Sequence, residues 1–473
     1  MTIQRQFGVV VVGGGPAGLA VLLAAHKHGR LTELLEQGLL IVERGPCIGS
    51  GQIGNYAINS DSTGYTFVDP LRVGNEPTLH AILETPLARR IAAAGPDAVP
   101  LCDAGELLAL IGRALHDIVL KYPRSAVLTG CTAETAHLRR NGGWQLIATD
   151  ANGNKLTIQA KNMVLATGAA QPKVRLQREL IAGVPVLERW GDRLMQSGEV
   201  IGIGGLAKVA GRLHGKSNLK VAILGGSTSA MSVAHALLHR LPEVQFGAGA
   251  LTLFHRRPLR IYYTSPEEAL ADGYTEFGPA DVCPITNRVY RLAGFRLDSR
   301  ELAMQLRGIG GRLPEPRMRL HQLKQRDPEA VRLVDSADLV IAALGYRPSA
   351  LPILDQHGAV VTLFSQTSSS APLVDDRCRV MDSHGNPISG LFGIGLAAGF
   401  VPRGKLGGEP SFVGQANGLW LWQNDIGSII VDAVLPTAAI APQTLRMRAK
   451  PTSEQPSEGP SDTTIAVAAG TGV

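Results

Sequence analysis

The chain has 473 residues, a formal net charge of +6, 45% hydrophobic residues and 18% charged residues. This length predicts two or three domains with sizeable cores. The mildly basic balance comes without a long Lys/Arg run or a basic stripe interleaved with aromatic residues, so we expect no nucleic-acid partner. The five cysteines have neither CxxC nor metal-ligand spacing, which argues against a disulfide framework or a metal site and predicts a reducing, cytoplasmic compartment.

The first predicted elements form a strand–helix–strand unit. Residues 7–12 are a short apolar run typical of a buried parallel strand, residues 19–28 have the pattern of a helix ending at Gly29, and residues 39–42 are the next strand. Glycines interrupt the apolar stretch between the first strand and the helix, which indicates neither a secretory signal nor a membrane helix. We therefore expect no association with a membrane.

The turn of this unit has the GxGxxG pattern of dinucleotide-binding domains, in the sequence Gly13-Gly14-Gly15-Pro16-Ala17-Gly18. Gly13 permits the tight turn, Gly15 lets a pyrophosphate approach the backbone, and Gly18 allows close packing of the helix on the strand. The N-terminus of the helix then faces the phosphates with N–H groups and the positive end of its dipole.

Glu43 follows the second predicted strand directly. A carboxylate at this place can accept hydrogen bonds from both hydroxyls of a ribose, and it repels a 2′-phosphate. The first unit is therefore predicted to bind a dinucleotide other than NADP.

Further along, residues 144–149 and 155–159 flank the turn sequence Ala151-Asn152-Gly153-Asn154 and predict a β-hairpin. Residues 162–167 predict another apolar strand. From residue 219 the first pattern recurs, with a strand at 219–224, a Gly/Ser turn, a helix at 230–241 and a strand at 250–254. Buried strands are also expected at 337–344 and 391–396. The tail from residue 441 is rich in Pro, Ser, Thr and Glu, which predicts disorder over most of it.

The second turn is a looser version of the first, in the sequence Gly225-Gly226-Ser227-Thr228-Ser229-Ala230. Arg256 and Arg257 follow the second strand of this unit at the place that Glu43 takes in the first. An arginine there is the expected partner of the 2′-phosphate of NADP. A solvated surface pair stays open as the alternative for these two arginines. The predicted NADP contacts are Gly225, Ser227, Thr228, Ser229, Arg256 and Arg257.

Four segments together resemble the two-dinucleotide-binding-domain flavoprotein superfamily: the two glycine turns, Ala166-Thr167-Gly168 after a β-meander, and Ala343-Leu344-Gly345-Tyr346. Within it, the chain is most similar to the flavin-containing and N-hydroxylating (class B) flavin monooxygenases. The run from Asp338 to Tyr346, followed by Pro352, is similar to the Asp…Ala-Thr-Gly-Tyr…Pro signature of the N-hydroxylating family. Gly393-Ile394-Gly395-Leu396 falls where that family has its last flavin-contacting segment. The resemblance covers residues 7–435.

The resemblance implies an α/β fold of two Rossmann-like three-layer dinucleotide-binding domains, in which the FAD domain is discontinuous and carries a β-meander. It implies an FAD-binding domain in residues 1–200, an NAD(P)H-binding domain in 201–350, and a return to the FAD domain in 351–440, with a C-terminal helix at 413–431. The tail then covers residues 441–473. The expected FAD contacts are Gly13, Gly15, Pro16, Ala17, Gly18, Glu43, Thr167, Gly168, Gly395 and Leu396.

Residues 47–70 follow the ribose-binding strand and are expected to lie close to the flavin ring. The catalytic residue is unknown, and the polar candidates near the flavin are Asn55, Asn59, Ser60 and Asp61, for which ordinary turn chemistry is an equal alternative. Cys47 would need a partner at position 52 for a Cys-x4-Cys pair, but that position is Gln52, and the second unit has no CxxC. We expect no dithiol relay, with Cys47 a packed or idle thiol.

The resemblance implies an FAD-dependent monooxygenase that consumes NADPH and O2 and acts on a small molecule, by N-hydroxylation or a related heteroatom or carbonyl oxygenation. A C4a-hydroperoxyflavin, shielded by bound NADP, would carry the oxygen. Two positions depart from the nearest family, since Leu344 replaces its usual Thr and Thr275 replaces the asparagine that helps hold the nicotinamide. A flavin dehydrogenase or reductase without oxygen insertion and a redox-sensing FAD/NAD(P)-binding protein stay open as alternatives, and so does a homo-oligomer.

Overall fold

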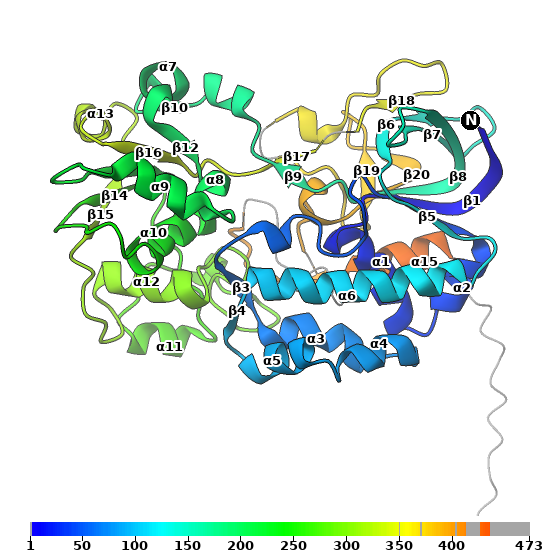
Figure 1. Cartoon of the computed structure of the whole chain (residues 1–473), viewed down its shortest axis with the longest axis horizontal. Helices are drawn as coiled ribbons and strands as arrows, with labels where there is room; N and C mark the ends of the chain where they lie inside the picture. The colour runs from blue at the N-terminus through cyan, green and yellow to red at the C-terminus, as the bar shows by residue number, and fades with distance from the viewer. Residues whose placement is uncertain (1, 350, 369–370, 403, 413–425, 436–473) are drawn as a thin grey trace, which may run out of the picture. The chain divides into compact units, whose positions relative to one another are not determined.

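The computed structural model describes residues 2–349, 351–368, 371–402, 404–412 and 426–435. Met1–Pro436 form one compact unit that contains two large sheets, each with its own buried apolar cluster (Figure 1). The fold is mixed α/β with parallel sheets, as the sequence predicts. The predicted domain boundaries near residues 200, 350 and 440 stay predictions.

The first sheet is built around β1 (Thr2–Val12), which lies between β2 (Leu39–Val42) and β8 (Lys155–Leu165) and is parallel to both. Its order is β18-β6-β7-β8-β1-β2-β5, and β20 also pairs with β8 in parallel. Strands far along the chain therefore complete the sheet that begins at the N-terminus. The other strands are β5 (Ala126–Leu128), β6 (Thr132–Leu138), β7 (Trp144–Thr149), β18 (Ile353–Leu354), β19 (Arg379–Met381) and β20 (Pro387–Gly393).

Strand β8 differs from its prediction, because the expected strands at 155–159 and 162–167 are one continuous strand. The polar residue at the junction, Asn162, is buried, and its side-chain amide donates a hydrogen bond to the carbonyl oxygen of Gly8 at 3.2 Å. A satisfied polar group can remain inside a strand. The predicted hairpin itself is confirmed, with β7 and β8 antiparallel.

Helix α1 (Pro16–Lys27) follows β1, three residues earlier than predicted, and its middle is fully buried. Helix α15 (Ile426–Val434) packs on it (Figure 1). A Cβ on Gly427 would lie 2.3 Å from the carbonyl oxygen of Ala20, so glycine is needed for this close approach. Of the predicted helix at 413–431, residues 413–425 lie outside the described residues, as does the predicted tail at 441–473.

A group of helices between β2 and β5 was not predicted. It comprises α3 (Gly64–Arg72), α4 (Pro77–Ile82), α5 (Pro86–Ala94) and α6 (Leu101–Leu120). The short helix α2 (Leu31–Gln37), which precedes β2, was not predicted either. The short antiparallel pair β3 (Asn59–Thr63) and β4 (Ala98–Pro100) brackets helices α3 to α5. Helix α6 contacts α1, α4 and α5, so this group extends the core of the first sheet.

The second sheet has five parallel strands in the order β12-β16-β13-β14-β15. They are β12 (Leu194–Gln196), β13 (Val221–Leu224), β14 (Leu251–His255), β15 (Met318–Gln322) and β16 (Leu339–Ala342). The predicted strand–helix–strand unit is confirmed as β13, α10 (Thr228–Arg240) and β14. The other helices in this part of the chain are α7 (Val186–Trp190), α8 (Ser197–Ile201), α9 (Gly205–Leu213), α11 (Pro266–Ala271), α12 (Leu297–Arg307) and α13 (Pro328–Asp335).

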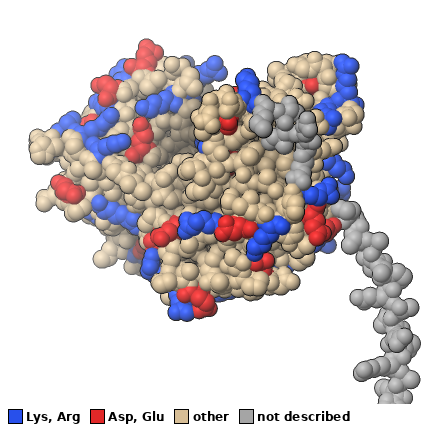
Figure 2. All heavy atoms as spheres, turned by 45° about the vertical axis from the view of Figure 1, so that its right-hand side comes forward, with Lys and Arg blue, Asp and Glu red and all other residues tan. Residues whose placement is uncertain are grey.

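The chain crosses between the sheets through β9 (Ala169–Ala170) and β17 (Arg347–Pro348), which pair antiparallel. The hydroxyl of Thr167 donates to the carbonyl oxygen of Ser349 at 2.7 Å and adds a side-chain link to this crossing. In the described part of the chain, the helices are all too short or too polar to span a membrane. On the face that Figure 2 shows, basic and acidic side chains lie interspersed.

Candidate active site

The first glycine turn joins β1 to α1 at the carboxyl edge of the first sheet. Gly13 has a φ of +106°, and a Cβ there would lie 2.3 Å from the carbonyl oxygen of Ala166. A Cβ on Gly18 would lie 2.0 Å from the carbonyl oxygen of Gly13. The fold of the protein alone therefore requires glycine at both positions.

Gly15 is different, because a Cβ there would meet only the backbone of Gly51, at ordinary contact distances of 3.4 Å to its Cα and 3.9 Å to its nitrogen. Gly15 is the N-cap of α1, Pro16 takes the first helical position, and among the described residues no side chain caps this helix. The first-turn N–H groups, among them that of Ala17, are thus available to an anion. Glycine at position 15 keeps the space beside them open.

The carboxylate of Glu43 is held at the end of β2. Its Oε2 accepts a hydrogen bond from the backbone N–H of Gly14, and its Oε1 accepts one from the N–H of Gly45, both at 2.6 Å. A carboxylate can accept about four hydrogen bonds. Two acceptor positions therefore remain for the hydroxyls of a ribose.

Two later segments reach the same edge of the first sheet. Thr167 and Gly168 follow β8, and Gly168 has a φ of +69°. Gly395, with a φ of +76°, begins a short 3-10 turn that includes the half-buried Leu396. A Cβ on Gly395 would lie 2.4 Å from the Cβ of Ala17, so glycine lets this turn pass over the first turn of α1.

These four groups together fit a flavin dinucleotide. The uncapped helix N-terminus suits a pyrophosphate, the held carboxylate suits a ribose, and glycines from three segments leave room for close backbone approach. FAD contacts at the ten predicted positions stay a proposal. The segments that carry these positions all lie at the same edge of the first sheet.

The second glycine turn repeats this construction between β13 and α10. Gly225 has a φ of +132°, and a Cβ there would lie 2.3 Å from the carbonyl oxygen of Ala343. A Cβ on Gly226 would lie 2.6 Å from the Cβ of His255. Ser227 is the N-cap of α10, with no side-chain cap among the described residues. A second anion-binding helix N-terminus therefore lies at the edge of the second sheet.

Thr228 and Ser229 begin α10, and Arg256 and Arg257 follow the end of β14. Both arginines are exposed, and Arg256 donates to the carbonyl oxygen of Leu180 at 3.2 Å. The neighbouring strands β13 and β14 are parallel, so their carboxyl ends bring the turn and the arginines to one edge. This placement suits a nucleotide with a 2′-phosphate.

The polar candidates of residues 47–70 have separate environments. Asn59 donates from its side-chain amide to Asp298 at 2.9 Å and so links β3 to α12. Asp61 is exposed. Its carboxylate lies in the electrostatic environment of Arg296, where burial lowers the pKa of the guanidinium and Asp61 opposes that change.

Ser60 is buried, and its hydroxyl is engaged inside the β3–β4 pair. The hydroxyl donates to the carbonyl oxygen of Ser62 at 2.5 Å and accepts from the N–H of Val99 at 3.2 Å. Asn55 is exposed and donates to the side chain of Gln52 at 2.8 Å. The bonds from Ser60 to Ser62 and from Asn55 to Gln52 are local turn contacts, whereas the bond from Val99 to Ser60 joins β4 to β3.

All five cysteines are free thiols, with Cys47 and Cys102 exposed and Cys131, Cys283 and Cys378 buried. Cys47 was expected to be a packed or idle thiol. It is exposed in the loop after β2, so the packed alternative is wrong, and the idle thiol stays a prediction. Among the residues that the structure describes, there is no group of three His, Cys, Asp or Glu side chains that could hold a metal ion.

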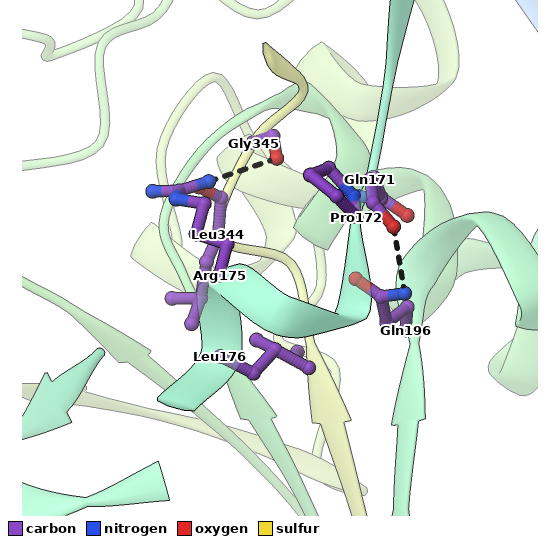
Figure 3. Close-up of a pocket in the computed structure, with 8 residues that line it drawn as sticks. Gln171, Pro172, Arg175, Leu176, Gln196, Leu344 and Gly345 are labelled. Atoms are coloured by element: carbon purple, nitrogen blue, oxygen red, sulfur yellow. Dashed lines mark hydrogen bonds between the residues drawn. The ribbon is translucent and has the colours of Figure 1, made fainter. Parts of the chain in front are cut away.

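A small pocket lies beside the turn that carries Leu344 (Figure 3). The guanidinium of Arg175 donates to the carbonyl oxygens of Leu344 and Gly345 at 2.8 and 3.2 Å. The pocket offers about 10 Å³, room for roughly one water molecule. A larger cavity of about 430 Å³ lies along β12 and α9, and its lining contains none of the predicted cofactor contacts.

The sequence did not predict the joint, which is a set of hydrogen bonds between residues 281–293 and residues 404–412. Residues 404–412 are here called the return segment. The buried carboxylate of Glu409 accepts hydrogen bonds from the N–H of Leu292 at 2.9 Å and of Ala293 at 2.8 Å. The hydroxyl of Ser411 donates to Asp281 at 2.5 Å. The return segment, which follows the glycine turn at 395, is thus fastened to residues 281–293.

Cys283 and Arg291 belong to the same joint. The Sγ of Cys283 accepts from the N–H of Gly408 at 3.1 Å, and the Nη1 of Arg291 donates to the carbonyl oxygen of Leu406 at 2.5 Å. Burial raises the pKa of the Cys283 thiol, but hydrogen bonds from Thr286, Gly408 and Ile285 outweigh burial and lower it to about 7. One signal in the sequence could have revealed this region. Residues 282–297, here called the arginine segment, contain three arginines and no acidic residue.

Comparisons with known proteins give a family and a fold. The family model of the pyridine nucleotide-disulphide oxidoreductases matches residues 7–269. The chain is 32% identical over 437 residues to CMP-5′-(3-aminopropyl)phosphonate hydroxylase of Streptomyces rubellomurinus, which covers 91% of this chain and 98% of the relative.

Among solved structures, the ornithine hydroxylase of Pseudomonas aeruginosa matches with a TM-score of 0.51 and 15% identity, covering 91% of this chain and 99% of that chain. The cadaverine monooxygenase of Erwinia amylovora, solved with FAD bound, matches with a TM-score of 0.50 and 14% identity, covering 94% of this chain and 100% of that chain. At these identities the likeness shows the fold, which is the two-domain FAD/NAD(P)-binding flavoprotein fold.

Proposed function

The chain belongs to the pyridine nucleotide-disulphide oxidoreductase family, and from this premise we propose that it is an NADPH-dependent FAD monooxygenase that hydroxylates the primary amine of a small molecule. That it is a flavin-dependent oxidoreductase follows from the family. The nucleotide, the use of oxygen and the substrate belong to the proposal.

One observation carries the proposal furthest, namely the match to a hydroxylase over nearly the full length of both chains. The solved structures with the same fold include an ornithine hydroxylase and a cadaverine monooxygenase, both named for amine substrates. The cysteines also favour a hydroxylase over an enzyme that passes electrons through a dithiol. Cys47 and Cys102 are exposed free thiols, and the other three cysteines are buried free thiols. The sequence contains no CxxC.

In the proposed reaction, a primary amine, O2, NADPH and one proton give a hydroxylamine, water and NADP+. NADPH supplies the two electrons that reduce one oxygen atom to water, while the other oxygen atom forms the N–O bond. When bound, FAD would supply the oxygen-transfer chemistry of the reaction. The task of the protein is to bind, to orient and to exclude water.

The residues of the chain divide this task between the two sheets. We propose that Glu43 binds the ribose of FAD, and that the first turn of α1, with Gly15 beside it, binds the pyrophosphate. At the second sheet, we propose that the N-terminus of α10 binds the pyrophosphate of NADPH. Arg256 and Arg257 then form charge-assisted hydrogen bonds with its 2′-phosphate.

For the substrate, we propose an amine that also carries a phosphonate or phosphate group. The name of the Streptomyces relative describes a 3-aminopropyl group on a phosphonate joined to CMP. A relative that matches over nearly its whole length makes the same class of molecule the first candidate here.

The experiment measures NADPH oxidation and product mass with CMP-5′-(3-aminopropyl)phosphonate under ¹⁸O2. The expected product carries one ¹⁸O, and its amount equals the extra NADPH consumed. The matched control is the propylphosphonate ester of CMP without the amine, which should give no oxygenated product. If FAD is reduced by NADPH but no tested amine gains oxygen, the enzyme is a flavin reductase or dehydrogenase, and the proposal is wrong.

A further inference from the structure

The arginine segment places three positive charges close together. Arg288, Arg291 and Arg296 lie within nine residues, and between Val282 and Leu297 the sequence has no aspartate or glutamate. Arg288 is exposed, whereas Arg291 and Arg296 are partly buried. Among the described residues, neither Arg288 nor Arg296 has a carboxylate within ion-pair distance of 4.0 Å, although twenty other such pairs exist.

Arg296 is held in a defined position. Its guanidinium lies over the ring of Tyr262, 4.6 Å from the centroid, and its Nη2 donates to the carbonyl oxygen of Arg291. Stacking and one backbone hydrogen bond fix the plane of the group, and a guanidinium has five N–H donors. The side chain is thus oriented in advance for a further acceptor.

The electrostatic environment of Arg296 is unfavourable. Burial lowers the pKa of the guanidinium, Arg288 and Arg291 lower it further, and Asp61 raises it. An arginine nevertheless keeps its charge at neutral pH. Arg288 and Arg296 repel each other, and neither lies within 4.0 Å of a carboxylate among the described residues, so an anion that contacts both would be favourable.

The location connects these arginines to the proposed active site. Asp61 lies on β3, which contacts α12. Asn59 of the same strand donates to Asp298, which directly follows the arginine segment. Arg291 donates to Leu406 in the return segment, at 2.5 Å. The cluster therefore borders both the loop after the ribose-binding strand and the segment after the glycine turn at 395.

We propose that Arg288 and Arg296, positioned by Arg291, form a subsite for a phosphoryl or phosphonyl group of the substrate. This inference rests on the proposed function, because it assigns the subsite to the substrate rather than to a cofactor. A tetrahedral group with several anionic oxygens can accept from two guanidinium groups at once, which a single carboxylate does less well. Arg260 is not part of the subsite, since its guanidinium stacks on Tyr290 and interacts with the charge of Asp281.

The test measures binding to the oxidised, FAD-loaded protein by isothermal titration calorimetry, with CMP as the probe and uncharged cytidine as its match. The wild type should bind CMP at least about tenfold more tightly than cytidine. Arg288→Ala and Arg296→Lys should each weaken CMP binding about tenfold and leave cytidine binding unchanged. Arg332→Ala, an exposed arginine on α13, is the control that should change neither.

Three results would overturn the inference. These are equal binding of CMP and cytidine to the wild type, unchanged CMP affinity in both variants, and a rise in the KM for NADPH that matches the loss of CMP affinity. The last result would assign the arginines to the cofactor phosphate. Because Arg288 is exposed, its variant should fold even if Arg296→Lys does not. Titration needs neither NADPH nor O2, so a failure of hydroxylation and a failure of this subsite are seen separately.

Discussion

The backbone N–H of Gly14 donates a hydrogen bond to the carboxylate of Glu43 at 2.6 Å. The two residues are 29 positions apart and belong to the two predicted parts of one dinucleotide site, the glycine turn and the residue at the end of the second strand. The bond joins the two parts of the site directly. The proposed ribose contact is therefore preorganised by the same turn that is proposed to receive the pyrophosphate.

The space at Gly15 gives the first prediction. In Gly15→Ala the new Cβ meets Gly51 at 3.4 Å, which the fold tolerates, but it occupies the proposed position of the pyrophosphate. Flavin content after purification should fall by a factor on the order of ten, with an unchanged far-UV circular dichroism spectrum. Gly211→Ala in α9, where a Cβ has open space, should keep full flavin content. Full flavin content in Gly15→Ala would show that the pyrophosphate lies elsewhere.

Arg256 and Arg257 give the second prediction. The wild type should prefer NADPH to NADH, and replacing both arginines with alanine should remove most of this preference. The loss of charged hydrogen bonds to the 2′-phosphate is worth roughly 1.5–3 kcal/mol. The measurement is kcat/KM for each nucleotide, with Arg332→Ala as the control. A wild type that uses both nucleotides equally would mean that these arginines are a solvated surface pair.

Cys283 gives a pH-dependent prediction. Its folded-state pKa of about 7 is lower than the value of about 8.5 for a thiol in an unfolded chain. A lowered folded-state pKa adds stability that is fully present above the unfolded value and is lost as the pH falls through the folded value. The stability of the wild type relative to Cys283→Ser should therefore decrease by about 1–2 kcal/mol between pH 9 and pH 6.

The measurement is the difference in Tm between the two proteins at each pH. Cys102→Ser replaces an exposed thiol and should run parallel to the wild type. A constant difference between wild type and Cys283→Ser over this range would show that the thiol does not ionise in the folded protein.

Much of the fold could be predicted because its signals are local. The turns at 13–18 and 225–230, the strands beside them and Glu43 are close in sequence, and their roles follow from one strand–helix–strand pattern. Tertiary contacts decided the rest. Whether Ser60 faces a ligand or closes the β3–β4 pair depends on Val99, which is 39 residues away. Likewise, the importance of Glu409 depends on Leu292, 117 residues before it.

The continuity of β8 could not be predicted from local sequence either. A polar residue at position 162 suggests a strand boundary when the sequence is taken alone. Its amide finds a partner in Gly8 of the neighbouring strand, and no local pattern contains that information. The arginine segment had a visible signal in its composition, but its meaning depends on Tyr262, Asp61 and the return segment.

We propose above all that this enzyme transfers oxygen from reduced FAD to its substrate. The most direct test mixes the NADPH-reduced protein with O2 in a stopped-flow spectrometer and follows the absorbance of a C4a-hydroperoxyflavin. We expect a transient C4a-hydroperoxyflavin spectrum that persists longer with NADP+ bound than after photochemical reduction without it. This spectrum should decay faster with a hydroxylatable amine. Reoxidation in one step to hydrogen peroxide, with every amine tested and with NADP+ present, would contradict the proposal.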